Sequence, residues 1–346
     1  MSTSLVEGVQ SGDGQLWIGR QVAAGTMLAA ASANQRAVKL LESSLKAHKA
    51  YDKAEYADGE RYSNSQIFTN EIAGEIGEFK VLGQPDIAGQ IIAQFFNVDV
   101  VTGAGPNYVH TITSAGAGGL YNTIHQSVGT GANSVKQIFW DALLDMLQWE
   151  CSAENPAASL NAKVLSRVAG QVYTTDPTAS IDTQESAVWP NIEGSITIDG
   201  TVFESVQGES LEIDNGSELE RGDSPDVVAF VNKRGQITRS LSTFLNDETL
   251  PLYYDTIYND STPSAGDTPV SEVVSAAVVT RYTVAANRYI EFDTPNLTFE
   301  PQEFPAVSPN PEGGTIDLTL SGSCRKSGST AALTVEVGSG ASAAFV

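Results

Sequence analysis

The residue types that most often perform catalysis or bind metals are sparse in this sequence. It contains three histidines, His48, His110 and His125, and two cysteines, Cys151 and Cys324. No histidine accompanies a second ligand at the spacing of a metal site, and the cysteines form neither a CxxC pair nor a disulfide framework. We therefore predict no metal and no cofactor, with idle or buried thiols and with histidines that are structural or lie on the surface.

Acidic residues are numerous enough to offer the paired carboxylates of a glycoside hydrolase. With 42 Asp and Glu residues, some pair is expected at a suitable distance by chance. The segments DGER (58–61) and ELER (218–221) recur, but recurrent charged loop ends more often form packing contacts or solvated surfaces. No nucleophile, base and orienting residue form a set, and GxSxG, HExxH and phosphate-binding glycine loops are absent. We predict that the protein is not an enzyme.

The charge balance argues against tight binding of nucleic acid. The chain has 19 Lys and Arg against 42 Asp and Glu, a formal net charge of −23. Such a surface repels phosphates, so any DNA near it is expected to pass without being held. A content of 41% hydrophobic and 18% charged residues predicts a folded protein, and 346 residues suit two domains of ordinary size.

One early segment, QVAAGTMLAAASA (21–33), imitates the apolar part of a signal peptide. It follows Glu7 and Asp13, and Arg20 is the only basic residue before it, so we interpret it as internal. No stretch approaches the roughly 18 consecutive apolar residues of a membrane-spanning helix. We therefore expect neither secretion nor a membrane partner.

One order of elements occurs twice along the chain. Residues 234–247 (RGQITRSLSTFLND) alternate apolar and polar side chains as a half-buried strand does, and a helical pattern follows at 250–258. Residues 73–86 (AGEIGEFKVLGQPD) match them at a shift of 161, and a helical pattern follows at 87–96. Further strand patterns follow both units. The order predicts an internal duplication in a mainly β protein with one short helix in each half.

Each unit also contains a long charged segment between two strands. These segments are HKAYDKAEYADGERYSNSQ (48–66) and DNGSELERGDSPDVVAFV (214–231). By helix propensity alone, residues 34–57 read as one helix, whereas the repeat indicates a strand followed by a long loop. We favour the repeat, because tertiary context often overrides propensity.

The composition of residues 175–191, TDPTASIDTQESAVWPN, is that of a linker. We therefore predict a first domain over residues 1–175, a linker over 176–192 and a second domain over 193–346.

The ordered series of motifs resembles the tail tube proteins of long-tailed, non-contractile bacteriophages. The resemblance spans about Gln15 to Val337 and is carried by LWIGRQVAAGT (16–26), FTNEIAGEIGEFKVLGQPDIAGQIIAQFFN (68–97), the unit at 211–260 and RYIEFDTPNLTFEPQEFPAVSPNPEGGTIDLTLSGS (288–323). It implies a virion protein that self-assembles into stacked rings, the tube through which DNA is ejected. It also implies the fold, here two tandem β-barrel or sandwich domains, each flanked by a short helix.

The resemblance also implies the partners of the chain. One barrel per chain usually gives a six-membered ring, so a chain with two barrels is expected to form a trimer with pseudo-sixfold symmetry. A hexameric ring is the alternative. The other partners would be further copies in stacked rings and the tape measure, tip and terminator proteins of the tail. Assembly would take place in the host cytoplasm, and DNA would pass without specific binding.

By the same resemblance, the two charged segments would reach the neighbouring ring. The candidate residues for this contact are Glu60, Arg61, Glu220, Arg221 and Asp223. Mixed charge keeps such segments soluble when free and complementary when stacked. The alternative interpretation is a pair of mobile surface loops.

Polar faces of the strands would line the bore of the tube. The candidates are Glu75 in the first unit and Gln236, Thr238 and Ser240 in the second, although these faces could equally lie outside. The alternative function is a secreted β-sandwich binding module, such as an adhesin or a carbohydrate-binding protein. That alternative predicts monomers with exposed aromatic platforms.

Overall fold

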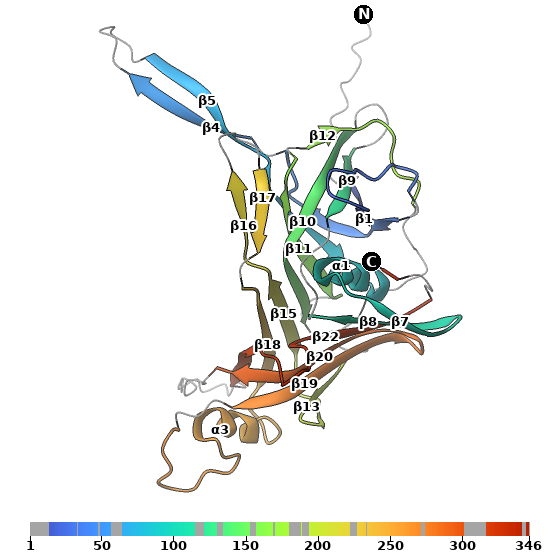
Figure 1. Ribbon diagram of the computed structural model, residues 1–346. Coiled ribbons are helices and arrows are strands. Elements are labelled where there is room, and N and C mark those ends of the chain that lie inside the picture. Colours follow the sequence, from blue (N-terminus) through green and yellow to red (C-terminus); the bar gives the residue numbers. More distant parts are fainter. Residues whose placement is uncertain are drawn as a thin grey trace, which may run out of the picture.

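Antiparallel β-strands and two short helices make up the described part of the protein (Figure 1). The computed structural model describes residues 14–32, 34–47, 49–56, 64–114, 121–129, 134–152, 157–168, 170–179, 188, 194–221, 227–232, 234–270, 274–300, 316–340 and 344–345. Within these residues, no helix is long and apolar enough to cross a membrane. The prediction of a mainly β fold is confirmed.

Six strands form one continuous sheet, the main sheet, in the order β6–β11–β10–β15–β18–β21. The strand β3 adds to it at the free edge of β6. Because β10 belongs to the first half of the chain and β15 to the second, backbone hydrogen bonds join the two halves. The bounds are β3 (Leu40–Ser43), β6 (Gly74–Leu82), β10 (Val135–Ser152), β11 (Ser159–Ser166), β15 (Gly208–Asp214), β18 (Gln236–Phe244) and β21 (Asp317–Cys324).

The remaining strands extend from two long ones, β10 and β20 (Arg288–Phe299). The first half of β10 pairs with β9, which continues to β1 and β2, and with the short β12. The strand β20 pairs with β19 on one edge and with β22 and β21 on the other. Next to β19 lies β13, which pairs in turn with β14. Next to β22 lies β8, which pairs in turn with β7. The bounds are β1 (Gln15–Arg20), β2 (Gln35–Val38), β7 (Val100–Ala104), β8 (Asn107–Thr113), β9 (Asn122–Val128), β12 (Gln171–Val172), β13 (Gly194–Ile198), β14 (Thr201–Phe203), β19 (Ser275–Ala285) and β22 (Thr334–Ser339).

The described strands form an open, branched sheet, so the prediction of closed barrels is wrong. The pairings end at β2, β3, β7, β12 and β14, each of which has one partner among the described strands. The physical reason lies in the length of β10 and β20. One edge of β10 pairs first with β9 and then with β15, and one edge of β20 pairs first with β22 and then with β21. The sheet branches at these strands and does not curl back on itself.

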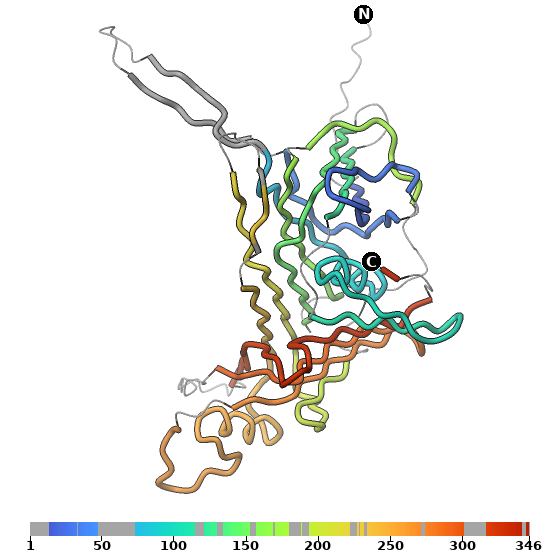
Figure 2. The backbone as a smooth tube through the Cα atoms, in the orientation of Figure 1, coloured from blue at the N-terminus to red at the C-terminus, as the bar shows by residue number. Residues whose placement is uncertain are grey.

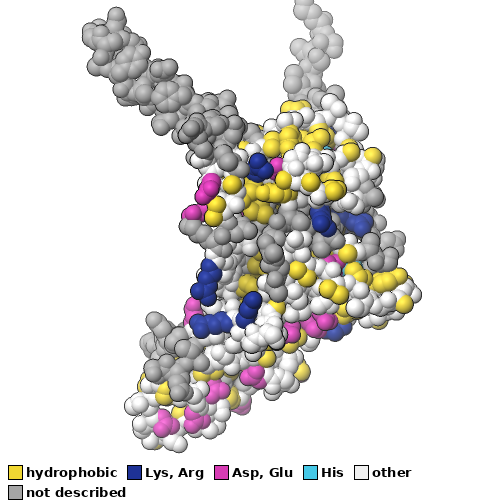
Figure 3. Space-filling model, viewed as in Figure 1, with side chains coloured by type: hydrophobic (Ala, Val, Ile, Leu, Met, Phe, Trp, Pro, Cys, Tyr) yellow, Lys and Arg dark blue, Asp and Glu magenta, His cyan; other side chains and the backbone are white. Residues whose placement is uncertain are grey.

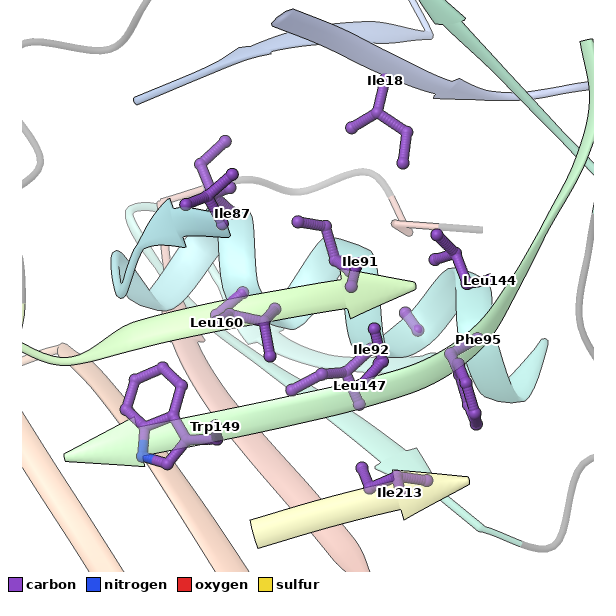
Figure 4. Packing of buried hydrophobic residues seen from close by; sticks show 14 of the residues in the cluster. Ile18, Ile87, Ile91, Ile92, Phe95, Leu144, Leu147, Trp149, Leu160 and Ile213 are labelled. Carbon is purple, nitrogen blue, oxygen red and sulfur yellow. The ribbon is translucent and has the colours of Figure 1, made fainter. Parts of the chain in front are cut away.

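The helix α1 (Pro85–Phe96) covers the apolar face of the main sheet. Its residues are buried at 11 of 12 positions, and Figure 4 shows Ile87, Ile91 and Phe95 facing side chains of β10, β11 and β15. The cluster combines residues of both halves, including Trp149 of the first half and Ile213 of the second. Burial of this apolar stripe is the main reason that the helix forms, because a helix of this length is marginal alone.

The order strand, hairpin, strand, helix occurs in both halves. The first half has β3, a hairpin of β4 (Lys49–Tyr56) and β5 (Asn64–Ile72), then β6 and α1; the second has β15, a hairpin of β16 (Ser217–Arg221) and β17 (Val227–Asn232), then β18 and α3 (Leu250–Tyr258). In both, the strands that flank the hairpin pair with each other. The described residues between 34 and 56 thus form strands β2, β3 and β4 and no helix, so the strand that the repeat predicted is confirmed. The long loop that it predicted next instead contains paired strands, as does the second charged segment.

The predicted linker is attached to the first half at its described positions. The indole N–H of Trp17 in β1 donates to the carbonyl of Ala179 at 2.9 Å. Further along, Val188 is buried and exchanges backbone hydrogen bonds with the carbonyl of Gly83 and the N–H of Ala158. The C-terminal end likewise returns to the first half, where Phe345 stacks on His110 with ring centroids 3.8 Å apart, and the red end of the trace reaches α1 (Figure 2).

A fully buried ion pair joins the main sheet to the strands packed beneath its second half. Arg239 of β18 donates from Nε to Glu209 of β15 at 2.6 Å, and from Nη1 to the Val278 carbonyl at 2.8 Å and to Thr294 Oγ1 at 2.7 Å. The Tyr282 hydroxyl donates to the second oxygen of Glu209 at 2.7 Å. Both charges are therefore well satisfied by strands β15, β18, β19 and β20, which is the condition under which a buried pair is tolerated.

Removal of one partner of this pair is expected to be costly. The variant Arg239→Met leaves Glu209 buried without its countercharge, and we expect the free energy of unfolding to fall by about 3–5 kcal/mol in urea titrations. The double variant Arg239→Met/Glu209→Leu removes both charges and is expected to be more stable than either single variant. A single variant within about 1 kcal/mol of the wild type would show that the pair is not needed.

A second buried polar group, His125, contacts the segment 171–179, whose first two residues pair with β10 as β12. His125 of β9 meets the ring of Tyr173 edge-on at 4.9 Å, and Lys136 of β10 forms an ion pair with Asp176 at 2.5 Å. Burial lowers the pKa of His125 from 6.5 to about 4, although the charge of Asp176 acts in the opposite direction. His125 is therefore a neutral core residue, which agrees with the structural one of the two alternatives, structural or surface, that the sequence left open.

The lowered pKa of His125 predicts a loss of stability in acid. Because the unfolded imidazole binds its proton near pH 6.5 and the folded one near pH 4, its contribution is complete above pH 6.5 and is lost as the pH falls to 4. Relative to His125→Gln, the wild type is expected to lose about 3 kcal/mol of unfolding free energy over this range. Parallel urea titrations of both proteins from pH 7 to pH 4 measure the difference. Parallel pH profiles would contradict it.

Candidate assembly surface

The main sheet has one buried face and one polar, partly exposed face. Along each strand the two kinds of residue alternate, as the pleat requires. The strand register aligns the polar residues in rows that cross all six strands or most of them. The rows are Lys80–Asn161–Gln148–Glu212–Thr238–Ser323, then Ser159–Glu150–Ser210–Ser240–Ser321, then Glu78–Lys163–Met146–Asp214–Gln236, in which Met146 is the one apolar member. The two halves of the chain thus present one shared polar surface, which we call the polar face.

Charges on the polar face are mixed, and its lysines are paired. Lys80 Nζ lies 2.8 Å from Glu150, and Lys163 Nζ lies 3.2 Å from Glu75, whose side chain is 58% exposed. Asn161 donates to Glu78 at 2.9 Å. Because each lysine has a carboxylate partner, neither is a free cation, and hydroxyl and amide groups dominate the rest of the face.

The structure brings the four predicted lumen residues together on this face. Gln236, Thr238 and Ser240 alternate along β18, and the ion pair with Lys163 places the Glu75 carboxylate on the same side of the sheet. Sequence reasoning missed the partners of these residues on β10, β11, β15 and β21. Along each of these strands the polar partners alternate with buried residues, and this pattern could have identified them from the sequence. The register that aligns them across strands is a long-range property, which the sequence pattern does not contain.

The β16–β17 hairpin stands on the end of the main sheet next to β15 and β18 (Figure 1). Four contacts fix the hairpin to the first half of the chain, two of them at its base and one, from Arg221, at the opposite end of β16. Arg221 Nη2 donates to the carbonyl of Ala73 at 2.8 Å. Asp145 accepts two further hydrogen bonds. Its carboxylate accepts from Ser217 N at 2.9 Å, and its backbone carbonyl accepts from Asn215 N at 2.9 Å. The ring of Phe230 lies 6.0 Å from that of Tyr121.

Asp145 is buried at this junction, and burial raises the pKa of its carboxyl above the usual range. Its bond from the backbone N–H of Ser217 acts in the opposite direction. A carboxylate that accepts backbone N–H groups at the base of a hairpin fixes the direction in which the hairpin leaves the sheet. The two bonds to Asp145 therefore orient the base of the hairpin relative to the polar face.

A family model for phage tail tube proteins matches residues 13–324. The chain belongs to the phage tail tube protein family. A search of curated proteins found no match. Membership confirms the resemblance and makes the protein a structural component of the virion tail. The secreted binding module has no support from this match.

The described residues of the tail tube protein include only part of the predicted inter-ring contact. Glu220 is exposed on β16, whereas Arg221 is anchored to Ala73 within the same chain. Glu60, Arg61 and Asp223 lie outside the described residues. Of this predicted set, the described structure therefore offers Glu220 as an exposed charge and assigns Arg221 an anchoring contact.

Other chemistry-bearing residues serve the fold of the tail tube protein. Both cysteines are buried free thiols, and His110 Nδ1 lies 2.9 Å from a carboxylate oxygen of Asp99 in a site closed to solvent. Among the described residues, no group of three His, Cys, Asp or Glu side chains could hold a metal ion.

The Arg221 anchor predicts a measurable loss of order in the hairpin. Arg221→Ala removes the bond to Ala73, and we expect the free energy of unfolding to fall by about 1–2 kcal/mol. Hydrogen exchange of residues 227–232 should accelerate at the same time. The neighbouring exposed residue supplies the control, since Glu220→Ala is expected to change stability by about 0.5 kcal/mol or less. Equal effects of both substitutions would contradict an anchoring role.

Proposed function

We propose that this tail tube protein self-assembles into stacked rings whose bore conducts DNA during ejection into the host. The observation that supports the proposal most is the polar face, which runs unbroken from β6 to β21 while α1 and the apolar core cover the opposite side over much of its width. A wall of this kind needs one wet side and one buried side. A structural role without enzymatic activity is part of the proposal.

The unpaired edges of the sheet supply a means of ring closure. The strands β2, β3, β7 and β14 each have one partner in the described part of the chain. An exposed edge is a template for pairing with another chain. Repetition of one such contact around an axis closes a ring when the rotation fits.

We propose a trimeric ring with pseudo-sixfold symmetry, with a hexamer as the alternative. The repeated order of β3 to α1 and β15 to α3 supports two equivalent units per chain. The units would be residues 1–175 and 193–346, related by duplication and joined by residues 176–192. Three chains would then supply six units to the circle.

The lumen would be lined by the polar face, with Glu75, Gln236, Thr238 and Ser240 among its residues. DNA would slide over such a surface because a held phosphate needs an available cation, and both lysines of the face are paired. Screening limits repulsion to about 8 Å in physiological salt, so only groups that line the bore act on DNA.

The two hairpins would contact the next ring, through Glu60 and Arg61 in the first and through Glu220, Arg221 and Asp223 in the second. The contact of Arg221 with Ala73 would set the angle of the second hairpin. Further partners would be the tape measure, tip and terminator proteins, with assembly in the host cytoplasm.

Negative-stain electron microscopy of the purified, concentrated and warmed protein tests the proposal. We expect hollow stacked rings, with threefold symmetry in class averages viewed down the tube axis. A variant that lacks residues 216–223 is expected to remain folded, as circular dichroism can check, and to fail to elongate. Monomers that persist even with a tail initiator complex would overturn the proposal, and tubes of normal length from the deletion variant would overturn the role of the hairpin.

A further inference from the structure

A basic cleft lies at the junction of the two halves and borders the polar face, with which it shares Asp214 and Gln236. The cavity has a volume of about 690 Å³ and lies between the C-terminal end of α1, the adjacent ends of β15 and β18, and residues 323–326. Its charged lining consists of Arg234, Arg325 and Lys326, together with a single carboxylate, Asp214. All three basic residues are exposed.

The three cations of the cleft are available for a partner. Among the described residues, none of Arg234, Arg325 and Lys326 forms an ion pair with a carboxylate. The backbone is nonetheless held in place, since the N–H of Arg325 donates to the carbonyl of Asn296 at 2.9 Å. On the face shown in Figure 3, Lys and Arg side chains gather between α3 and the β16–β17 hairpin. Such a concentration is unusual in a chain with a net charge of −23.

The complementary charge lies at the C-terminal end of α3 and in the turn that follows. Asp255, Asp260 and Asp267 belong to this segment, and Asp199 lies close enough to act on Asp255. Burial, and then the charges of Asp260 and Asp199, raise the pKa of Asp255. The last turn of α3 contains no basic residue. We call Asp255, Asp260 and Asp267 the acidic turn.

The acidic turn is ordered and largely uncovered. Asp260 accepts from Thr262 N at 2.9 Å, and Asp267 accepts from Ser264 N at 2.5 Å. Only Leu252, Tyr253 and Thr256 of α3 are buried, in contrast with the almost complete burial of α1. The C-terminal end of a helix also carries partial negative charge, which favours a cation beside it.

We propose that the basic cleft of one copy receives the acidic turn of another copy. The proposal rests on the self-assembly proposed above and identifies one of its contacts. The two surfaces do not meet within one chain, because no residue of α3 or of the acidic turn lines the cleft. A contact between different surfaces of two copies is heterologous, so it can repeat around a ring or along a stack.

The energetic role of the contact is selection of the correct docking geometry. Exposed ion pairs contribute little affinity, but complementary patches speed association and exclude wrong arrangements. Two free copies with many carboxylates repel each other. At the cleft, the basic side chains of one copy would instead attract the acidic turn of the other. Elongation should therefore slow as salt screens the contact, over a Debye length of about 8 Å at physiological ionic strength.

Charge exchange between the two surfaces tests the contact. We expect Arg325→Glu/Lys326→Glu to slow tube elongation at least about tenfold in low salt, as followed by light scattering and electron microscopy. Asp260→Lys/Asp267→Lys should do the same, and the protein with all four substitutions should recover to within about threefold of the wild type. Asp260→Asn/Asp267→Asn keeps the side-chain acceptors of the turn and is expected to slow elongation less.

A matched control has the same change of net charge at partly or fully exposed residues away from the cleft and outside the edge strands proposed for ring closure. Arg20→Glu/Lys46→Glu is expected to elongate at the wild-type rate. Wild-type tubes together with normal elongation of both cleft and turn variants would overturn the contact and leave the tube proposal standing. Loss of elongation without recovery in the four-substitution protein would also overturn it.

Two further outcomes concern binding of DNA by the cleft and failure of tube assembly. If the cleft variant alone is impaired, and its tubes bind duplex DNA more weakly in fluorescence anisotropy, the cleft binds phosphates and the inference is wrong. Failure of the wild type to form tubes contradicts the proposed function. In that case the same variants are compared by sedimentation velocity in low salt. The contact predicts dimers of the wild type, fewer dimers of each double variant and recovery in the four-substitution protein. Absence of this pattern overturns the contact as well.

Discussion

The register between β10 and β15 is the constraint on which the rest of the molecule depends. It pairs Gln148 with Glu212 and Trp149 with Leu211, so that polar and buried residues of the two halves lie on matching faces. A shift of one residue would reverse the faces of a strand. Trp149 would then lie on the wet side and Gln148 under α1. The shared core and the continuous polar face are therefore two consequences of one alignment.

The buried Arg239–Glu209 pair follows from the same alignment. Both residues lie at buried positions of the alternating pattern, on the adjacent strands β15 and β18. Their side chains point toward the layer formed by β19 and β20. An apolar pair would tolerate small displacements of that layer. Arg239, in contrast, can donate its hydrogen bonds only when the carbonyl of Val278 and the hydroxyl of Thr294 lie within reach of its guanidinium. We infer that the pair selects one arrangement of β15 and β18 on β19 and β20.

Sequence reasoning succeeded where the signal was local. Alternation predicted the strands β6 and β18, helical stripes predicted α1 and α3, and the repeat correctly opposed the helix that propensity favoured at 34–57. It failed where strand pairing is long-range. The length of β10 does not reveal that its edge changes partner from β9 to β15, which is why an open, branched sheet replaced the expected barrels. The anchor from Arg221 to Ala73 spans 148 positions and has no local signal.

The distribution of cations connects this architecture to the proposed assembly. The lysines on the polar face are paired with carboxylates, whereas Arg234, Arg325 and Lys326 of the cleft have no such partner among the described residues. A conduit for DNA favours the first arrangement, since free cations in a bore would retain phosphates. Asp214 and Gln236 belong both to the polar face and to the cleft, so the proposed docking of the acidic turn would also neutralise the cations beside the bore. Association of acidic subunits requires the second, since something must offset their repulsion. Because the cleft forms where α1 of the first half meets β15 and β18 of the second, only a chain whose halves are correctly joined presents both surfaces together.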